Sequence, residues 1–186
     1  MIKQYTGMKA EKAVSDEPLP KGGYVAKIVG AKVEEYSWGS VLVIALDVAE
    51  GDHAGFFRKQ YDANANEDKK WKGTYRLTVP DEGSQYFESN KRVFNNFIYA
   101  LEASNDGYHF DWDEAKLKGK LFGALYREKE FEGTSGDVIT TTECGGSTDI
   151  ASIRSGDFRL PKDKLLERPA TVNNAYAAVP DNDLPF

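Results

Sequence analysis

The segment Gly22–Gly51, GGYVAKIVGAKVEEYSWGSVLVIALDVAEG, decides the fold of this chain. Apolar residues alternate from Tyr24 to Val33, which is typical of a strand with one buried face, and Gly30 suggests a bulge. Residues 40–49 are apolar except for Ser40 and Asp47 and are rich in β-branched residues, as expected of a strand buried on much of both faces. The tetrapeptide SWGS between the two segments predicts a short hairpin turn.

The following residues are expected to add further strands and one principal helix. A third strand is predicted to begin in AGFFRKQY, residues 54–61, and the chain re-enters a strand at TYRLTVP, residues 74–80, after a loop. Apolar residues at helical spacing predict a helix within residues 84–107. A second hairpin is predicted over residues 116–146, with its turn at EGTSGD.

This succession of elements predicts the fold class. Strand, strand, strand, helix, strand, strand is the order of an OB-fold, a five-stranded partly open Greek-key barrel, so we predict a mainly β protein with one principal helix. A mixed α+β sandwich is an alternative with the same order. We expect a flexible N-terminal arm over residues 1–20, one OB-fold domain over 21–167 and a disordered tail over 168–186. Residues 147–168 are expected to pack back on the domain.

Composition restricts the functional classes. A chain of 186 residues with 40% hydrophobic content fits one domain with tails. The single cysteine, Cys144, leaves no internal disulfide and no cysteine metal cluster, so we expect neither a metal nor a cofactor. The absence of a signal peptide and of a long apolar run predicts a cytoplasmic protein. The sequence leaves the oligomeric state open, including a homo-oligomer.

Charge is distributed unevenly along the chain. The formal net charge is −6, yet residues 54–80 carry six bases and three acids, a net of +3. Residues 81–115 carry eight acids and two bases, a net of −6. The sequence therefore predicts a polarised molecule in which a basic segment adjoins an acidic one.

The basic segment interleaves cations with aromatic residues, in FFRKQY and again in DKKWKGTYR. OB-folds bind single strands by stacking bases on aromatic rings and placing phosphates along basic side chains. We therefore predict a nucleic-acid-binding groove without strong sequence preference. Its candidate residues are Trp38, Arg58, Lys59, Tyr61, Lys70, Trp71, Lys72, Tyr75, Arg76, Tyr126, Arg127 and Lys129.

Several of these aromatic residues have a structural alternative. Trp38 is also placed to cap one end of a barrel, and Trp71 to fold back onto the principal helix. Of Phe56 and Phe57, alternation puts one in the core.

The chain ends in VPDNDLPF, residues 179–186, with an apolar terminus that a soluble protein has little reason to expose. Pro185 stiffens the backbone, and Phe186 offers a ring and an α-carboxylate to a basic pocket. Asp181 and Asp183 add long-range attraction to such a surface. We predict a partner-binding tip made of Asp181, Asp183, Leu184, Pro185 and Phe186.

Two resemblances point in the same direction. DNDLPF resembles the acidic C-terminal tip of bacterial and phage single-stranded DNA-binding proteins, although Asn182 interrupts the acids and Leu184 replaces the usual isoleucine. That tip implies recruitment of replication and repair proteins and competition with DNA for the groove. Residues 50–62, 69–77, 107–130 and 153–164 are similar to proteins of phages and integrated elements of Gram-positive bacteria, which are regarded as OB-fold single-stranded DNA-binding proteins.

We therefore expect a non-enzymatic, single-stranded DNA-binding protein of phage or mobile-element replication, recombination and repair. A strand-annealing or recombination mediator using the same groove is one alternative. A metal-dependent nuclease is another, because Asp111, Asp113 and Glu114 lie close together in DWDEAK. Asp113 also fits an ordinary helix N-cap, and His53 and His109 lack the spacing of metal ligands.

Overall fold

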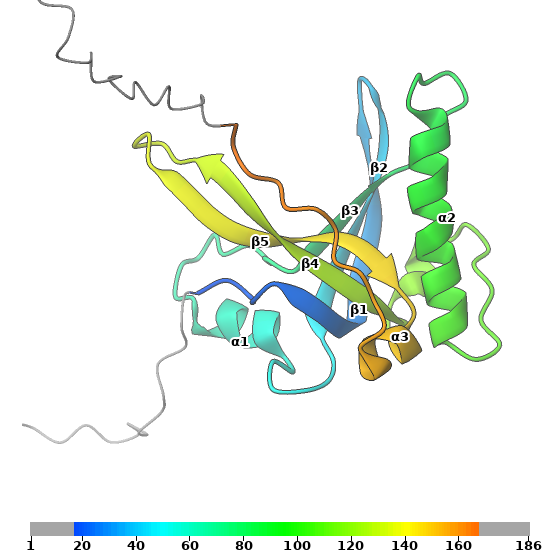
Figure 1. Ribbon diagram of the computed structural model, residues 1–186, viewed down its shortest axis with the longest axis horizontal. Helices are drawn as coiled ribbons and strands as arrows, with labels where there is room; N and C mark the ends of the chain where they lie inside the picture. Colours follow the sequence, from blue (N-terminus) through cyan, green and yellow to red (C-terminus); the bar gives the residue numbers. More distant parts are fainter. Residues whose placement is uncertain (1–16, 168–186) are drawn as a thin grey trace, which may run out of the picture.

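The computed structural model describes residues 17–167 (Figure 1). The remaining residues of the predicted N-terminal arm and the whole predicted tail with its tip lie outside this range. In chain order the elements are β1 Gly22–Tyr36, β2 Gly39–Val48, α1 Phe56–Ala63, β3 Thr74–Thr78, α2 Phe87–Ser104, the 3₁₀-helix η1 Glu114–Leu117, β4 Leu121–Glu132, β5 Val138–Thr148 and α3 Ile150–Ser155.

The five strands form one antiparallel sheet in the order β3-β2-β1-β4-β5. β3 and β5 approach each other, but in the described part of the chain no hydrogen-bonded ladder joins them, so the sheet is not closed. The prediction of a mainly β protein with one principal helix, α2, is confirmed. The OB barrel remains a prediction.

The first hairpin forms as its sequence predicts. Tyr36 pairs with Gly39 across a two-residue turn, and the register of β1 against β2 shifts between Ile28 and Gly30, which places a bulge there. Gly39 has a φ of 139°, a conformation that side-chain-bearing residues rarely adopt. This glycine allows β2 to start directly after the turn.

The predicted strand at residues 54–61 is wrong, because this segment forms helix α1. The Asp47 carboxylate accepts hydrogen bonds from the backbone N–H groups of Phe57, at 2.9 Å, and Arg58, at 3.3 Å. These bonds satisfy donors in the first helical turn that have no partner within the helix. Phe57 is buried and Phe56 packs partly against the core, so one of the two lies in the core as expected. The strand predicted at residues 74–80 is confirmed as β3.

Helix α2 packs against β3, β4 and β5 (Figure 1). It buries Phe94, Phe97, Ala100 and Leu101. The Phe97 ring meets Tyr75 of β3 and Phe122 of β4 at centroid distances of 5.9 and 5.5 Å. Of the helices within residues 17–167, none combines the length and apolarity that crossing a membrane requires.

The part of the chain after α3 packs back on the domain, as predicted. β1 pairs with β4 only as far as Tyr126. Beyond that point Lys164 forms a parallel β-bridge with the edge of β4 that β1 leaves unpaired. Its N–H donates to the Glu128 carbonyl and its carbonyl accepts from the Glu130 N–H, both at 2.9 Å. In Figure 1 this segment, drawn in orange, runs alongside the β4–β5 hairpin.

The folded domain begins earlier than the predicted boundary at residue 21. Leu19 is 1% exposed and belongs to the core, and its carbonyl accepts a hydrogen bond of 2.5 Å from the Thr142 hydroxyl. Gln60 of α1 donates to the Glu17 carbonyl at 3.0 Å. Residues 17–20, expected to belong to the arm, are therefore packed against α1 and β5.

Candidate nucleic-acid interface

A groove of about 620 Å³ lies at the open side of the sheet, with β3 and β5 both contributing to its walls. The start of α1, the second half of β4, Val93 of α2 and the segments just before β1 and β3, Leu19 among them, also contribute to the lining. The structure brings half of the predicted DNA-binding residues together here. They are Lys72, Tyr75, Arg76, Tyr126, Arg127 and Lys129.

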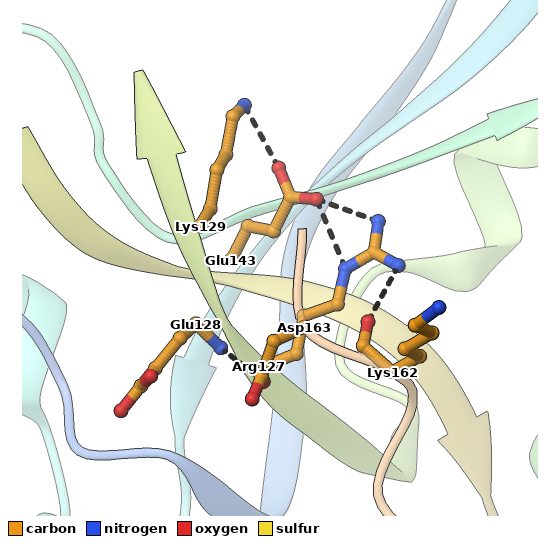
Figure 2. Close-up of polar contacts among 6 residues, drawn as sticks. All are labelled: Arg127, Glu128, Lys129, Glu143, Lys162 and Asp163. Carbon is orange, nitrogen blue, oxygen red and sulfur yellow. Dashed lines mark hydrogen bonds and ion pairs between the residues drawn. The ribbon is translucent and has the colours of Figure 1, made fainter. Parts of the chain in front are cut away.

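Two of the groove cations share one carboxylate (Figure 2). Arg127 donates to Glu143 Oε1 from Nε at 3.1 Å and from Nη2 at 2.7 Å, and Lys129 Nζ lies 2.9 Å from the other oxygen. Arg127 Nη1 also donates to the Lys162 carbonyl at 3.2 Å. Burial alone would raise the pKa of Glu143, but the hydrogen bonds from Lys129 and Arg127 lower this pKa overall. The carboxylate is thus ionised at neutral pH and holds both cations in place.

Arg76 of β3 is held in a similar way. Its Nη2 donates to Glu34 at 2.9 Å and to the Tyr36 hydroxyl at 2.7 Å, while its guanidinium lies 6.0 Å from the Tyr36 ring centroid. Hydrogen bonds from Lys32, Tyr36 and Arg76 lower the pKa of Glu34 to about 2. A phosphate that binds Arg76, Arg127 or Lys129 must therefore compete with an internal carboxylate.

Trp38 lies at the tip of the β1–β2 hairpin with 62% of its surface exposed. Its ring stacks on Tyr36 at a centroid distance of 5.2 Å and an interplanar angle of 13°. The indole is therefore available to a ligand, in contrast to the alternative in which it caps a barrel. Tyr36 was not among the predicted DNA-binding residues, although its position next to the hairpin turn could have identified it.

Trp71 is packed against the domain and is not free in its loop. Its Nε1 donates to the Leu46 carbonyl at 3.0 Å, and its ring meets Tyr61 of α1 at a centroid distance of 5.7 Å. The Arg58 guanidinium lies 5.2 Å from the indole centroid. Trp71 therefore packs against α1, whereas the alternative from the sequence analysis placed it against the principal helix, α2. Arg58, Tyr61 and Trp71 thus form one packed cluster.

Tyr75 and Tyr126 lie in the core, each only 3% exposed, so neither presents a ring face for stacking. Alternation along β3 and β4 places them on the buried face, together with Leu77 and Ala124. Both tyrosines were predicted to bind DNA because each is followed by an arginine, and this prediction did not consider the alternation that buries their side chains. Both tyrosines nevertheless line the groove.

The other predicted cations lie on and after α1. Lys59 donates to the Ala54 carbonyl at 2.8 Å. Lys70 lines a second pocket of about 570 Å³ formed by residues of the loop 64–72, and Lys72 lines both this pocket and the groove. No ion pair involving Lys70 or Lys72 is present among the described residues. The second pocket is also lined by Glu67 and Asp68, so these two lysines, although unpaired in the described part of the chain, lie close to acidic side chains.

Phe131 is a groove residue that the sequence interpretation missed. It is 41% exposed and follows Arg127 and Lys129 at alternate positions of β4, so the three side chains share one face of the strand. Ile139 lies opposite Phe131 in the register of β5. The spacing of residues 127, 129 and 131 was the signal that could have identified it.

Two of the three carboxylates behind the nuclease alternative, Asp111 and Asp113, have structural roles. Asp111 and Asp113 pair with Lys116, and Asp113 accepts the Ala115 N–H at 3.0 Å as the N-cap of η1, which confirms the N-cap interpretation. Within residues 17–167 no group of three or more His, Cys, Asp or Glu side chains could hold a metal ion. Burial raises the pKa of the Cys144 thiol to about 12, so this thiol is protonated at neutral pH.

No protein-family model matches the chain, and no curated protein matches it in sequence. The function is therefore inferred from the geometry of the groove.

Proposed function

We propose that the groove between β3 and β5 binds single-stranded DNA and that the protein coats such strands without chemical conversion. The observation that carries this proposal is that Lys72 and Arg76, before and within β3, line one groove with Arg127 and Lys129 of β4. Exposed aromatic rings lie on the two hairpins, Trp38 on one and Phe131 on the other. Cations and rings together match the phosphates and the unpaired bases of a single strand.

A duplex suits this arrangement less well. Paired bases are stacked inside a double helix, so rings such as Trp38 and Phe131 gain a stacking partner only from an unpaired strand. Base stacking of this kind is sequence-tolerant because every base has a flat face. The proposed binding therefore prefers single strands and has little sequence preference.

The strand order supports an OB-type fold as part of the proposal. Order β3-β2-β1-β4-β5 is that of a Greek-key barrel opened along the seam between its third and fifth strands. In OB-folds the loops joining strands one to two and four to five border the nucleic-acid-binding face. Here those positions hold Trp38 and the turn that follows Phe131.

The overall negative charge does not exclude this function, because local charge governs contact. The net charge of −6 includes the acidic stretch 81–115, whereas residues 54–80 are basic. We also propose that residues 181–186 recruit replication or repair proteins to the coated strand, in the bacterial cytoplasm during phage or mobile-element replication. The charge and ring of this terminus suit a basic pocket with an apolar floor.

Substitution of the exposed indole tests the stacking part of the proposal. Trp38→Ala should weaken binding of a fluorescent single-stranded oligonucleotide about 5- to 150-fold, since stacking on an aromatic side chain contributes about 1–3 kcal/mol per base. Trp38 does not line the groove itself but lies at the tip of the β1–β2 hairpin, and Tyr99→Ala is the matched control because Tyr99 is equally exposed, at 61%, and lies on α2 instead of a hairpin. Equal affinities for the two variants would remove Trp38 from the binding surface.

A further inference from the structure

Two tyrosine hydroxyls at the groove have no hydrogen-bond partner of ordinary geometry among the described residues. They belong to Tyr75 of β3 and Tyr126 of β4, both 3% exposed and both lining the groove. A buried hydroxyl without a partner destabilises the folded state relative to the unfolded chain, where water satisfies it. Two such groups on adjoining walls of one groove call for a physical explanation.

Packing does not require these hydroxyls. The Tyr126 ring stacks on Phe57 at 6.1 Å and meets Tyr24 edge-on at 5.8 Å, while the Tyr75 ring stacks on Phe122 at 6.2 Å. A phenylalanine ring would make the same contacts at either position. The hydroxyls thus add a cost in stability without a gain in packing.

Both hydroxyls are neutral at physiological pH. Burial raises the pKa of Tyr126 well above its usual value. Burial likewise raises the pKa of Tyr75, and the nearby Cys144 adds to this effect, whereas the Ser147 side chain, which lies within reach of a weak hydrogen bond, and the charge of Arg127 lower it. A neutral tyrosine hydroxyl both donates and accepts hydrogen bonds.

We propose that Tyr75 and Tyr126 form a subsite that hydrogen-bonds the polar edge of a nucleobase from the bound single strand. This proposal rests on the proposed function of the groove. Hydroxyls that donate and accept can match the donors and acceptors of any base, so the subsite adds affinity for bases without strong discrimination. Phe56 and Phe57 line the same groove and supply apolar walls for a flat ring.

Access to the subsite involves movement of side chains. The two hydroxyl oxygens are covered in the unbound protein. A base of the bound strand therefore reaches them only when the side chains that cover them move.

The test removes each hydroxyl and keeps each ring, in Tyr75→Phe and Tyr126→Phe. The matched control is Tyr108→Phe, because the Tyr108 hydroxyl is also buried without a partner but lies outside the groove. Fluorescence anisotropy compares two ligands of equal length, an oligodeoxythymidine and an abasic oligonucleotide with the same phosphates. Thermal unfolding of each variant is measured in parallel.

We expect each groove variant to bind oligodeoxythymidine about 3- to 10-fold more weakly, with unchanged affinity for the abasic strand and a melting temperature equal to or above that of the wild type. Tyr108→Phe should bind both ligands like the wild type. Unchanged oligodeoxythymidine binding in both groove variants, with a wild type that binds, would refute the subsite alone. A wild-type protein that binds neither ligand would refute the proposed function itself.

Discussion

Replacement of Glu143 by glutamine should strengthen binding to single-stranded DNA. In the unbound protein this one carboxylate neutralises both Arg127 and Lys129, at 2.7 and 2.9 Å. Partly exposed ion pairs of this kind contribute about 0.2–1 kcal/mol each. Binding a phosphate that breaks both ion pairs therefore costs about 0.4–2 kcal/mol of binding free energy. Glutamine preserves the shape of the side chain and removes its charge. The single-strand affinity of Glu143→Gln should therefore rise about 2- to 30-fold.

The assay is an anisotropy titration of a fluorescent single-stranded oligonucleotide at fixed ionic strength. The control variant is Glu50→Gln, because Glu50 pairs with Arg154 of α3 at 2.5 Å, and neither residue lines the groove. Both variants change the net charge by the same amount, so any general loss of repulsion cancels. If Glu143→Gln bound no more tightly than Glu50→Gln, Arg127 and Lys129 would not be phosphate contacts.

Three further outcomes concern pH, the domain boundary and the chain terminus. Hydrogen bonds from Lys32, Tyr36 and Arg76 lower the pKa of Glu34 from an ordinary 4.5 to about 2. The ionised Glu34 therefore contributes its full stabilisation above about pH 4.5 and loses it as the pH falls toward 2. A melting temperature that stays constant from pH 7 to pH 2 would contradict this. Leu19→Ala should lower the free energy of unfolding in urea by about 2–5 kcal/mol because Leu19 is in the core, whereas removal of residues 1–16 should leave it within about 1 kcal/mol. Deletion of Asp181–Phe186 should abolish capture of replication proteins while keeping or raising single-strand affinity, and unchanged capture would contradict the role of the tip.

Sequence patterns identified those parts of the fold that depend on local periodicity. The first hairpin, the bulge near Gly30, α2 and the second hairpin follow from alternation, helical spacing and turn residues within single segments. α1 could not be identified in this way, because its first turn is capped by Asp47, which lies on β2. A short alternating segment such as FFRKQY fits a strand and a helix equally well, and the tertiary contact decides between them.

The sequence identified candidate side chains by their chemistry and could not give their positions. Arg76 of β3 and Arg127 and Lys129 of β4, which were selected for their charge, line one groove. Three aromatic residues predicted to stack on bases do not present free rings: Trp71 packs against α1, and Tyr75 and Tyr126 are buried. Exposure of an aromatic side chain depends on which face of its strand meets the core, and for β4 this face is the one that packs with residues of α2 and of the other strands. Because side chains alternate along β4, Tyr126 points to the buried face and Phe131 to the exposed face.

The most direct test of the groove is a comparison of single-stranded and duplex oligonucleotides of equal length, titrated with the purified protein over a range of salt concentrations. With about 3–5 phosphate contacts, the logarithm of the single-strand affinity should fall against the logarithm of salt concentration with a slope of about −2 to −3.5, and the duplex should bind more weakly throughout. Equal affinity for both forms at low salt, or single-strand binding that does not respond to salt, would contradict a cationic groove for unpaired strands.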